Sequence, residues 1–300
     1  MTRAGNNIFR HGHPSGWCSM EIIAAVGILA FSLGAGLLGS LLGLGGGIVI
    51  IPALTLVFGY PMQVAIGASL IGVIATSTGA ASYYVKEGMS NIRLGMVLET
   101  ATTAGSVIGA LVAVYTNQQI LAVAFGVLLV YASFYMVRRP ERLAPPSKGQ
   151  RADAFFGLSA SYVDKKDGSE VRYDVRRIDR GLGASLGAGA MSGLLGVGGG
   201  IIKVPVMNIW MGVPMKAAAA TSNFMIGITA LAGAVIYYGY GQISPVVTAV
   251  VAVGVFFGAM MGSRVAHRVA GTLLRRTFAV VMIVIAVLML LKGAGVVSVL

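Results

Sequence analysis

Two glycine-rich motifs, 153 residues apart, offer the clearest chemistry in the chain. Gly-Leu-Gly-Gly-Gly-Ile occupies 43–48 and Gly-Val-Gly-Gly-Gly-Ile occupies 196–201, and Pro52 and Pro205 follow at matching distances. Consecutive glycines allow positive φ and leave backbone amides uncovered. A helix that begins just after them presents free N–H groups and a partial positive charge, which together bind anions. The motifs therefore predict an anion site, with the prolines supporting the helix breaks; a tight helix crossing is the alternative. The glycines of the expected site are Gly45, Gly46, Gly47, Gly198, Gly199 and Gly200.

One lysine follows the second motif and has no equivalent after the first. Lys203 lies three residues past Gly200, whereas the matching position in the first copy is Ile50. A lysine inside an apolar segment is costly in a membrane and is a functional hypothesis by default. Beside free amides, its ammonium would bind an anion. The alternative is that the side chain extends to the membrane interface.

Hydroxyl and amide side chains occupy related positions in both halves. Ser69 and Ser222 are equivalent under the same offset, and Thr221 and Asn223 flank the second of them. These groups can donate hydrogen bonds to an oxyanion. Serine and threonine also commonly bond to carbonyls of their own helix, and that alternative stays open.

Glu99 is the one acid well inside the apolar segments of the first half. A carboxylate in such a place could relay a proton. It could instead pair with Arg93, a turn or two away. No nucleophile triad, metal cluster or ATP-binding loop is recognisable, so we expect neither catalytic or metal-binding residues nor a cofactor, and no enzyme activity.

The composition is that of a membrane protein. The chain is 56% hydrophobic and 11% charged, against about 25% charged residues in soluble domains. No Asp, Glu, Lys or Arg occurs between Ile22 and Val85, a run long enough for two or three spans of roughly 20 residues. The net charge of +12 does not indicate a nucleic-acid partner, because the basic residues gather in a few loops between apolar segments.

The 153-residue offset continues without a gap through serine, threonine, tyrosine and glycine positions as far as Gly109 and Gly262. The chain is therefore an internal duplication. Each half contains five apolar segments, of which the second has only about a dozen residues and is short for a full crossing. The expected segments are 22–43, 48–59, 62–85, 94–115 and 119–137, and then 181–197, 201–212, 217–240, 244–263 and 277–291.

A charged linker separates the halves. Residues 138–180 hold 11 Lys or Arg and 7 Asp or Glu, and the alternating stretch 161–175 around Asp167-Gly168 is typical of a small β-hairpin, with a disordered linker as the alternative. The expected organisation is an N-terminal tail (1–21), membrane repeat 1 (22–137), a cytoplasmic linker (138–180) and membrane repeat 2 (181–300).

Charge also predicts the orientation of the halves. With the linker inside and five crossings per half, 18 of the 22 Lys and Arg fall on the cytoplasmic side, as positive loops prefer. An odd number of crossings inverts the second half relative to the first. We therefore expect an all-α polytopic membrane protein with two inverted repeats, the architecture of many alternating-access transporters.

The paired motifs, with Ala220-Thr-Ser-Asn-Phe224, resemble the sulfite exporter TauE/SafE family, also called the toluene sulfonate uptake permeases, over about residues 22–291. The resemblance implies a multi-pass permease of the cell (inner) membrane for small sulfur-containing anions such as sulfite or sulfonates, coupled to an ion gradient in which H⁺ is the candidate ion. The expected partners are the anion and the bilayer. Two other functions remain open: an anion channel, and a membrane sensor that signals through the linker.

Overall fold

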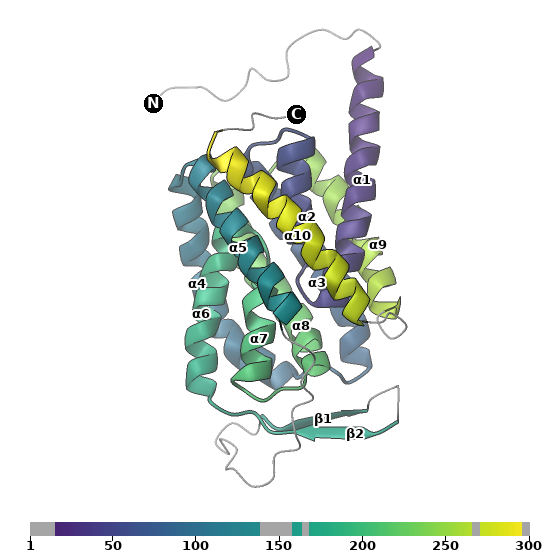
Figure 1. Cartoon of the computed structure of the whole chain (residues 1–300), viewed down its shortest axis with the longest axis vertical. Helices are drawn as coiled ribbons and strands as arrows, with labels where there is room; N and C mark the ends of the chain where they lie inside the picture. Colours follow the sequence, from purple (N-terminus) through teal and green to yellow (C-terminus); the bar gives the residue numbers. More distant parts are fainter. Residues whose placement is uncertain (1–15, 139–157, 164–167, 266–270, 296–300) are drawn as a thin grey trace.

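The computed structural model describes residues 16–138, 158–163, 168–265 and 271–295. This part of the chain is helical apart from two short strands (Figure 1). The elements are α1 (Gly16–Leu42), α2 (Gly47–Pro52), the π-helix η1 (Ala53–Val57), α3 (Met62–Lys86), α4 (Ile92–Tyr115), α5 (Gln118–Arg138), β1 (Ala160–Val163), β2 (Glu170–Tyr173), α6 (Ile178–Leu195), α7 (Gly200–Ile209), α8 (Met215–Gly239), α9 (Pro245–Val265) and α10 (Gly271–Gly293).

The molecule is a polytopic all-α membrane protein. Five of its helices, α1, α3, α4, α8 and α9, are long and apolar enough to cross a membrane. Large apolar side chains such as Ile108, Val235 and Phe257 are half exposed or more, as expected of helices that face lipid tails rather than water.

The first two segments form one helical hairpin, in which the second arm (47–57) is much shorter than the first. Phe58, just after η1, stacks edge-on against Phe31 of α1 with 6.1 Å between ring centroids. Its ring also lies 3.2 Å from the Cβ position of Gly27. The chain therefore runs down α1, reverses at 43–46 and returns alongside α1. A return helix of about ten residues is typical of re-entrant segments.

The second half begins with the same hairpin. Met211, after α7, lies 2.7 Å from the Cβ position of Gly181 near the start of α6, and its carbonyl accepts the Arg176 amide at 3.1 Å. Gly181 and Met211 are 153 residues after Ile28 and Phe58, so both halves fold back at equivalent places. Each hairpin therefore turns back toward the end of the bundle at which it began.

The two halves interlock through reciprocal contacts. A Cβ on Gly258 of α9 would lie 2.0 Å from the Leu33 carbonyl of α1, and a Cβ on Gly105 of α4 would lie 2.1 Å from the Leu186 carbonyl of α6. These two contacts are the same contact under the 153-residue offset. Each hairpin therefore packs against the fourth segment of the other half, at glycines that let the backbones approach closely.

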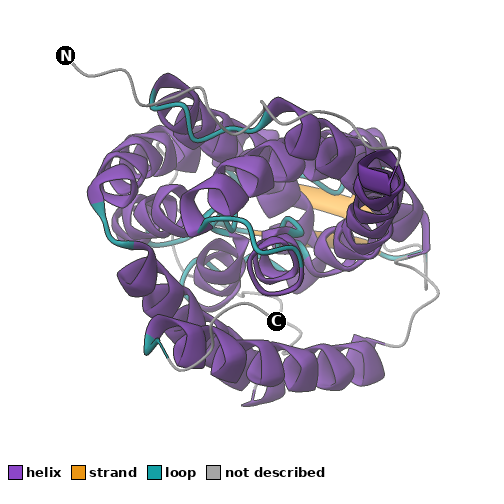
Figure 2. Cartoon of the chain, turned by 90° about the horizontal axis from the view of Figure 1, so that it is seen from above, coloured by secondary structure: helices purple, strands orange, loops and turns teal. Residues whose placement is uncertain are grey.

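Helices α3 and α8 lie against each other, and α5 pairs with α10 along one side of the bundle (Figures 1 and 2). The α5–α10 pair is antiparallel, with Ser133 donating to the Ala279 carbonyl at 2.9 Å and Leu290 against Gly126. Lys292 of α10 donates to the Thr55 carbonyl of η1, so this outer pair covers the returning arm of the first hairpin.

Loops from both halves meet at each end of the bundle. At one end the Tyr115 and Tyr240 hydroxyls are 2.7 Å apart. At the opposite end lies the strand pair, and α1 begins at the upper end of Figure 1 whereas α6 begins at the lower end. Orientation in a membrane, and hence inversion of the repeats, stays a prediction.

The linker contains two antiparallel strands in the register Ala160↔Tyr173 to Val163↔Glu170. Tyr162 is buried, and burial raises the pKa of the Tyr173 phenol to about 12. The strands are fastened to the helices, because the Asn91 side chain donates to the Leu158 carbonyl at 2.9 Å. The turn between them, 164–167, and most of the preceding linker lie outside the described residues.

Candidate functional site

The site is built where the tips of the two hairpins touch. We name these tips corner 1 (residues 43–47) and corner 2 (residues 196–200). A Cβ on Gly47 would lie 2.5 Å from the Gly196 carbonyl, and a Cβ on Gly200 would lie 2.2 Å from the Gly43 carbonyl. The two contacts are equivalent under the repeat offset. The structure thus brings together the glycine positions predicted from the sequence.

The equivalent serines join the corners. Ser69 of α3 donates to the Gly196 carbonyl of corner 2 at 2.8 Å, and Ser222 of α8 donates to the Gly43 carbonyl of corner 1 at 3.3 Å. Each hydroxyl therefore binds the corner of the opposite half and not a carbonyl of its own helix. Both serines are fully buried.

Apolar side chains fill the middle of this contact. The Cβ positions of Gly45 and Gly198, which are equivalent, each lie within about 3.5 Å of Val73 and Ile226. Val73 and Ile226 are also equivalent under the offset. Gly45 and Gly198 have positive φ values of 81° and 78°. Any residue with a Cβ would be strained in this conformation, so the turns require glycine.

The two corners differ in their free backbone donors. In corner 1 and the following turn, most amides already donate to nearby carbonyls; these are the amides of Leu44, Gly45, Gly47, Val49 and Ile50. In corner 2 and the start of α7, the amides with backbone acceptors are those of Gly196, Ile202 and Lys203. Within the described chain, the amides of 197–201 have no such acceptor. Corner 2 is therefore the better anion cradle of the two.

Two predicted residues point away from the corners. The Thr221 hydroxyl accepts the Asn91 amide at 2.9 Å, at the end of the bundle that carries the strands. The Asn223 side chain donates to the Ser40 carbonyl at 3.4 Å, while its Oδ1 is buried without a hydrogen-bond partner in the described part of the chain. Pro52 and Pro205 lie in the second turn of α2 and α7, and Pro52 directly precedes the π-helix η1.

Lys203 and Glu99, which the sequence suggested for separate roles, form a buried pair. The Lys203 ammonium lies 3.6 Å from Glu99 Oε2 and donates to the Thr229 hydroxyl at 2.7 Å. Thr229 donates in turn to Glu99 Oε1 at 2.6 Å. The side chains of Lys203 and Glu99 are 0% and 7% exposed.

This pair decides two alternatives left open by the sequence. Pairing of Glu99 with Arg93 is wrong, because Arg93 is exposed near the start of α4 and the acid turns inward to α7 and α8. Extension of Lys203 to the interface is also wrong in this structure, because its ammonium is buried between three helices. Helix α7 begins at the centre of the bundle, so its fourth residue is far from the helix end that an interface would meet.

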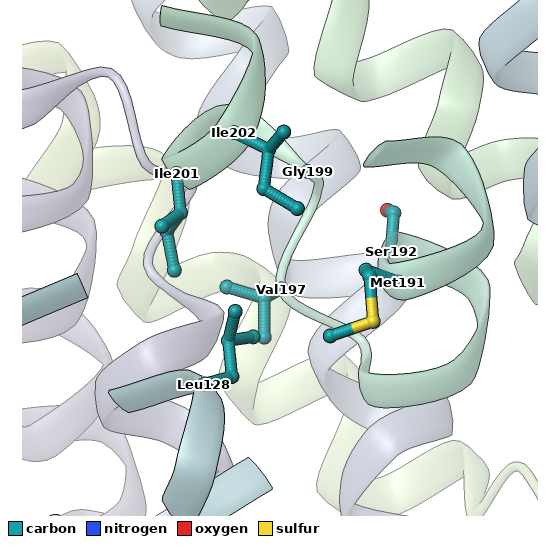
Figure 3. Close-up of a pocket in the computed structure, with 7 residues that line it drawn as sticks. All are labelled: Leu128, Met191, Ser192, Val197, Gly199, Ile201 and Ile202. Carbon is teal, nitrogen blue, oxygen red and sulfur yellow. The ribbon is translucent and has the colours of Figure 1, made fainter. Parts of the chain in front are cut away.

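A small apolar pocket lies beside corner 2 (Figure 3). Its only polar side chain is Ser192, whose hydroxyl is buried without a hydrogen-bond partner among the described residues. Lys203 and Ser222 do not line it. Of the predicted anion ligands, Gly199 borders this pocket, whereas the side chains of Lys203 and Ser222 are buried away from it. The lining residues are Leu128, Met191, Ser192, Val197, Gly199, Ile201 and Ile202.

Sequence reasoning missed Thr229 as a site residue. Thr229 joins the ammonium to the carboxylate, and Thr103 adds a second hydroxyl bond to Glu99 Oε1 at 3.2 Å. The available signal was the pair of charges itself: a buried lysine and a buried acid in one bundle need each other. Across the described residues, no group of three or more His, Cys, Asp or Glu could hold a metal ion.

Comparison with known proteins gives a consistent result. A family model described as Sulfite exporter TauE/SafE matches residues 28–289. The probable membrane transporter protein YunE of Bacillus subtilis is 27% identical over 282 residues, covering 92% of this chain and 98% of the relative. The probable membrane transporter protein MJ0441 of Methanocaldococcus jannaschii is 24% identical over 271 residues, covering 85% and 91%. No solved structure matches the chain.

Proposed function

The chain belongs to the sulfite exporter TauE/SafE family, and we propose that it is a secondary-active transporter of small sulfur-containing anions such as sulfite or a sulfonate. Membership and the names of the relatives indicate a membrane transporter rather than an enzyme. The substrate class, the transport cycle and the residues assigned below are proposals.

The observation that carries the proposal is corner 2. Its glycine backbone leaves the amides of 197–201 without backbone acceptors in a buried setting, and Lys203 adds a cation one helical turn further on. An oxyanion entering this place would regain the donors that it loses with its hydration shell. The Ser222 hydroxyl lies 3.2 Å from the Cβ position of Gly200, at the end of the same corner.

The arrangement of the corners supports alternating access. The corners form the central contact between the halves, and each is joined to the other half by one serine hydroxyl, Ser69 or Ser222. A rearrangement at the contact between the corners would exchange these two hydroxyl bonds and open corner 2 to one end of the bundle at a time. The closed state described here would then be an occluded intermediate.

We assign the protein to the inner membrane with the 138–180 linker in the cytoplasm, since that places most of the basic residues inside. H⁺ is the coupling ion that Glu99 suggests, because this carboxylate is buried next to the proposed anion site. The repeats 22–137 and 181–300 contribute one glycine corner each to the proposed site.

The direct test uses purified protein with sulfite, thiosulfate, methanesulfonate, sulfate and acetate. Sulfite, thiosulfate or methanesulfonate should raise the thermal unfolding midpoint, because a ligand that binds the native state stabilises it. Uptake of the stabilising anion into proteoliposomes should saturate and show counterflow. Stabilisation by acetate alone would contradict the sulfur-anion assignment.

Two other functions give different outcomes. An anion channel would conduct without saturation or counterflow. A sensor that signals through the linker would bind an anion without moving it across the bilayer.

A further inference from the structure

Lys203, Thr229 and Glu99 form a chain of contacts across three helices, α7, α8 and α4. The ammonium donates to Thr229 at 2.7 Å, and Thr229 donates to Glu99 Oε1 at 2.6 Å. An ammonium has three donors, and within the described residues only this one is in a hydrogen bond. The charged partner of the other two donors is Glu99 Oε2 at 3.6 Å, so these donors become available to a ligand when that carboxylate is neutralised.

The contact between the two charges is loose. Nζ lies 3.6 Å from Glu99 Oε2, beyond the 2.7–3.2 Å of a hydrogen bond. Both hydroxyl donors to this carboxylate, from Thr103 and Thr229, reach Oε1, and Oε2 is buried with no hydrogen-bond partner in the described chain. The two hydroxyls thus hold the carboxylate through Oε1, and Oε2 is available to accept a proton.

The fold does not require this pair. The equivalent positions in the other half are Ile50 for Lys203 and Ala252 for Glu99, and both are uncharged. Thr76, the equivalent of Thr229, donates to the Gly72 carbonyl of its own helix at 3.0 Å and has no other side-chain hydrogen bond among the described residues. Replacing a buried ion pair by apolar residues is often neutral or stabilising. The same architecture therefore stands without charges in one half, and the charges in the other half have a different role.

Other charged groups lie near the ends of the helices packed around Glu99. Arg93 on α4 and Asp179 and Arg180 on α6 are exposed, and Lys216 near the start of α8 is partly exposed. The contacts of the carboxylate itself are to hydroxyls and to Lys203. Lys203 is therefore the charged group that lies within ion-pair distance of Glu99 in the described part of the chain.

We propose that Glu99 is the resident counter-ion of Lys203 and that the transported anion replaces it when Glu99 takes up a proton, so that one proton moves with each anion. This inference rests on the proposed transport function. Thr229 is the positioning residue that holds the ammonium and the carboxylate in reach of one another.

The charge balance of the site explains why a proton and an anion would move together. In the empty site the carboxylate (−1) and the ammonium (+1) cancel. With Glu99 protonated and a monovalent anion on Lys203, they cancel again. A site with the proton alone or the anion alone carries a net buried charge, which is expensive inside a membrane. The two neutral forms change conformation, the charged forms do not, and transport of a monoanion is electroneutral.

The test uses proteoliposomes and labelled methanesulfonate, whose sulfonate stays ionised across the pH range. An outside pH one unit lower than inside should give about tenfold accumulation, because one pH unit corresponds to 1.36 kcal/mol per proton. A membrane potential imposed with valinomycin and potassium should leave the uptake unchanged. Accumulation driven by the potential and not by the pH gradient would overturn the proposal while leaving transport established.

Single substitutions distinguish the roles of Glu99 and Thr229 in the coupling. Glu99→Gln should keep methanesulfonate counterflow but lose accumulation, and Thr229→Val should weaken the coupling. Thr76→Val is the matched control and should behave as wild type. If Glu99→Gln accumulates the anion as wild type does, the counter-ion role is wrong.

Lack of methanesulfonate transport would contradict the proposed function for this probe. A second measurement tests the counter-ion role without relying on transport. In Glu99→Gln the ammonium lacks its counter-ion. Replacing gluconate by chloride at constant ionic strength should then raise the unfolding midpoint of this variant more than that of wild type. Equal responses in the two proteins would overturn the counter-ion exchange on its own.

Discussion

At the residue scale, the pairing of Lys203 with Glu99 changes the expected behaviour of a lysine substitution. With the ammonium as a lone anion ligand, Lys203→Met would reduce affinity at unchanged stability. In the structure the same change leaves a carboxylate buried among Thr103, Thr229 and apolar side chains. Its first effect is therefore on folding, and affinity must be measured in a background that removes the unpaired charge.

Lys203→Met should destabilise the protein by about 3–5 kcal/mol, because breaking a buried ion pair strands one charge. The double variant Lys203→Met with Glu99→Gln should recover most of this loss. Acidification should also restore part of the stability of the single variant, since protonation of Glu99 removes the stranded charge. Thermal unfolding in detergent at two pH values measures both effects.

The control for volume is Ile50→Met, the same change of residue type at the equivalent uncharged position. It should shift the unfolding midpoint little. If the stability losses of Lys203→Met and Glu99→Gln simply add in the double variant, then the side chains of Lys203 and Glu99 do not interact.

At the element scale, the hairpin tips depend on glycines for close approach and not only for unusual backbone angles. Gly47 and Gly200 are the first residues of α2 and α7, and neither has a positive φ. Their constraint is the carbonyl of the opposite corner, at 2.5 Å and 2.2 Å from a Cβ. Those distances are shorter than real Cβ contacts allow, so an alanine must force the corners apart.

Gly200→Ala and Gly47→Ala should each lower the unfolding midpoint and abolish transport. Gly187→Ala in α6 is the matched control, because nothing lies within 4 Å of its Cβ position. The control should be neutral or stabilise the helix by about 0.5–1 kcal/mol, as expected when alanine replaces glycine inside a helix. Wild-type transport in Gly200→Ala would show that the corners do not need to touch.

The linker is joined to the helical bundle through Asn91. Its Oδ1 accepts the Leu94 amide at 3.0 Å and caps α4, while its Nδ2 donates to the Leu158 carbonyl at 2.9 Å. Asn91→Asp keeps the cap and removes the donor to the linker, whereas Asn91→Ala removes both.

Asn91→Ala should cost about 1–2 kcal/mol of stability for the lost cap. Asn91→Asp should cost less, yet limited proteolysis should cut the linker faster in both variants than in wild type. Unchanged cleavage of Asn91→Asp would mean that strand packing alone holds the linker in place.

At the scale of the whole molecule, the loops fall into two groups at opposite ends. Tyr115 and Tyr240 bring the α4–α5 and α8–α9 loops together. At the other end, Asn91 of the α3–α4 loop bonds both to Thr221 near the start of α8 and to Leu158 of the linker. Charge then predicts which end faces the cytoplasm, since the second group lies with the basic residues.

Cysteine labelling tests this topology. In a Cys18→Ser background, an impermeant thiol reagent on intact cells should label Asn117→Cys and Gln242→Cys. It should label Lys86→Cys and Ser169→Cys only after permeabilisation. Lys86 and Ser169 are exposed, so burial would not explain their protection. Equal labelling of Asn117→Cys and Ser169→Cys in intact cells would contradict the inverted arrangement.

Much of the architecture could be predicted from local sequence. Apolar segments, glycine corners and a charged linker are properties of short stretches, and the constant 153-residue offset makes each half a check on the other. The short second segments were recognisable by length. Their folding back as hairpins was not, because the direction of a return helix depends on contacts such as that between Phe31 and Phe58.

By itself, the sequence determined that this is a duplicated all-α membrane protein, because hydropathy and internal repetition depend on the order of residues and not on which side chains meet. Only the tertiary structure decided that Lys203 faces Glu99 and that Thr229 stands between them. Glu99 is more than 100 residues away from Lys203, and a shift of one residue along a helix turns a side chain by about 100°. Which charges meet is therefore settled by how the helices rotate and pack, and not by any stretch of sequence that contains them.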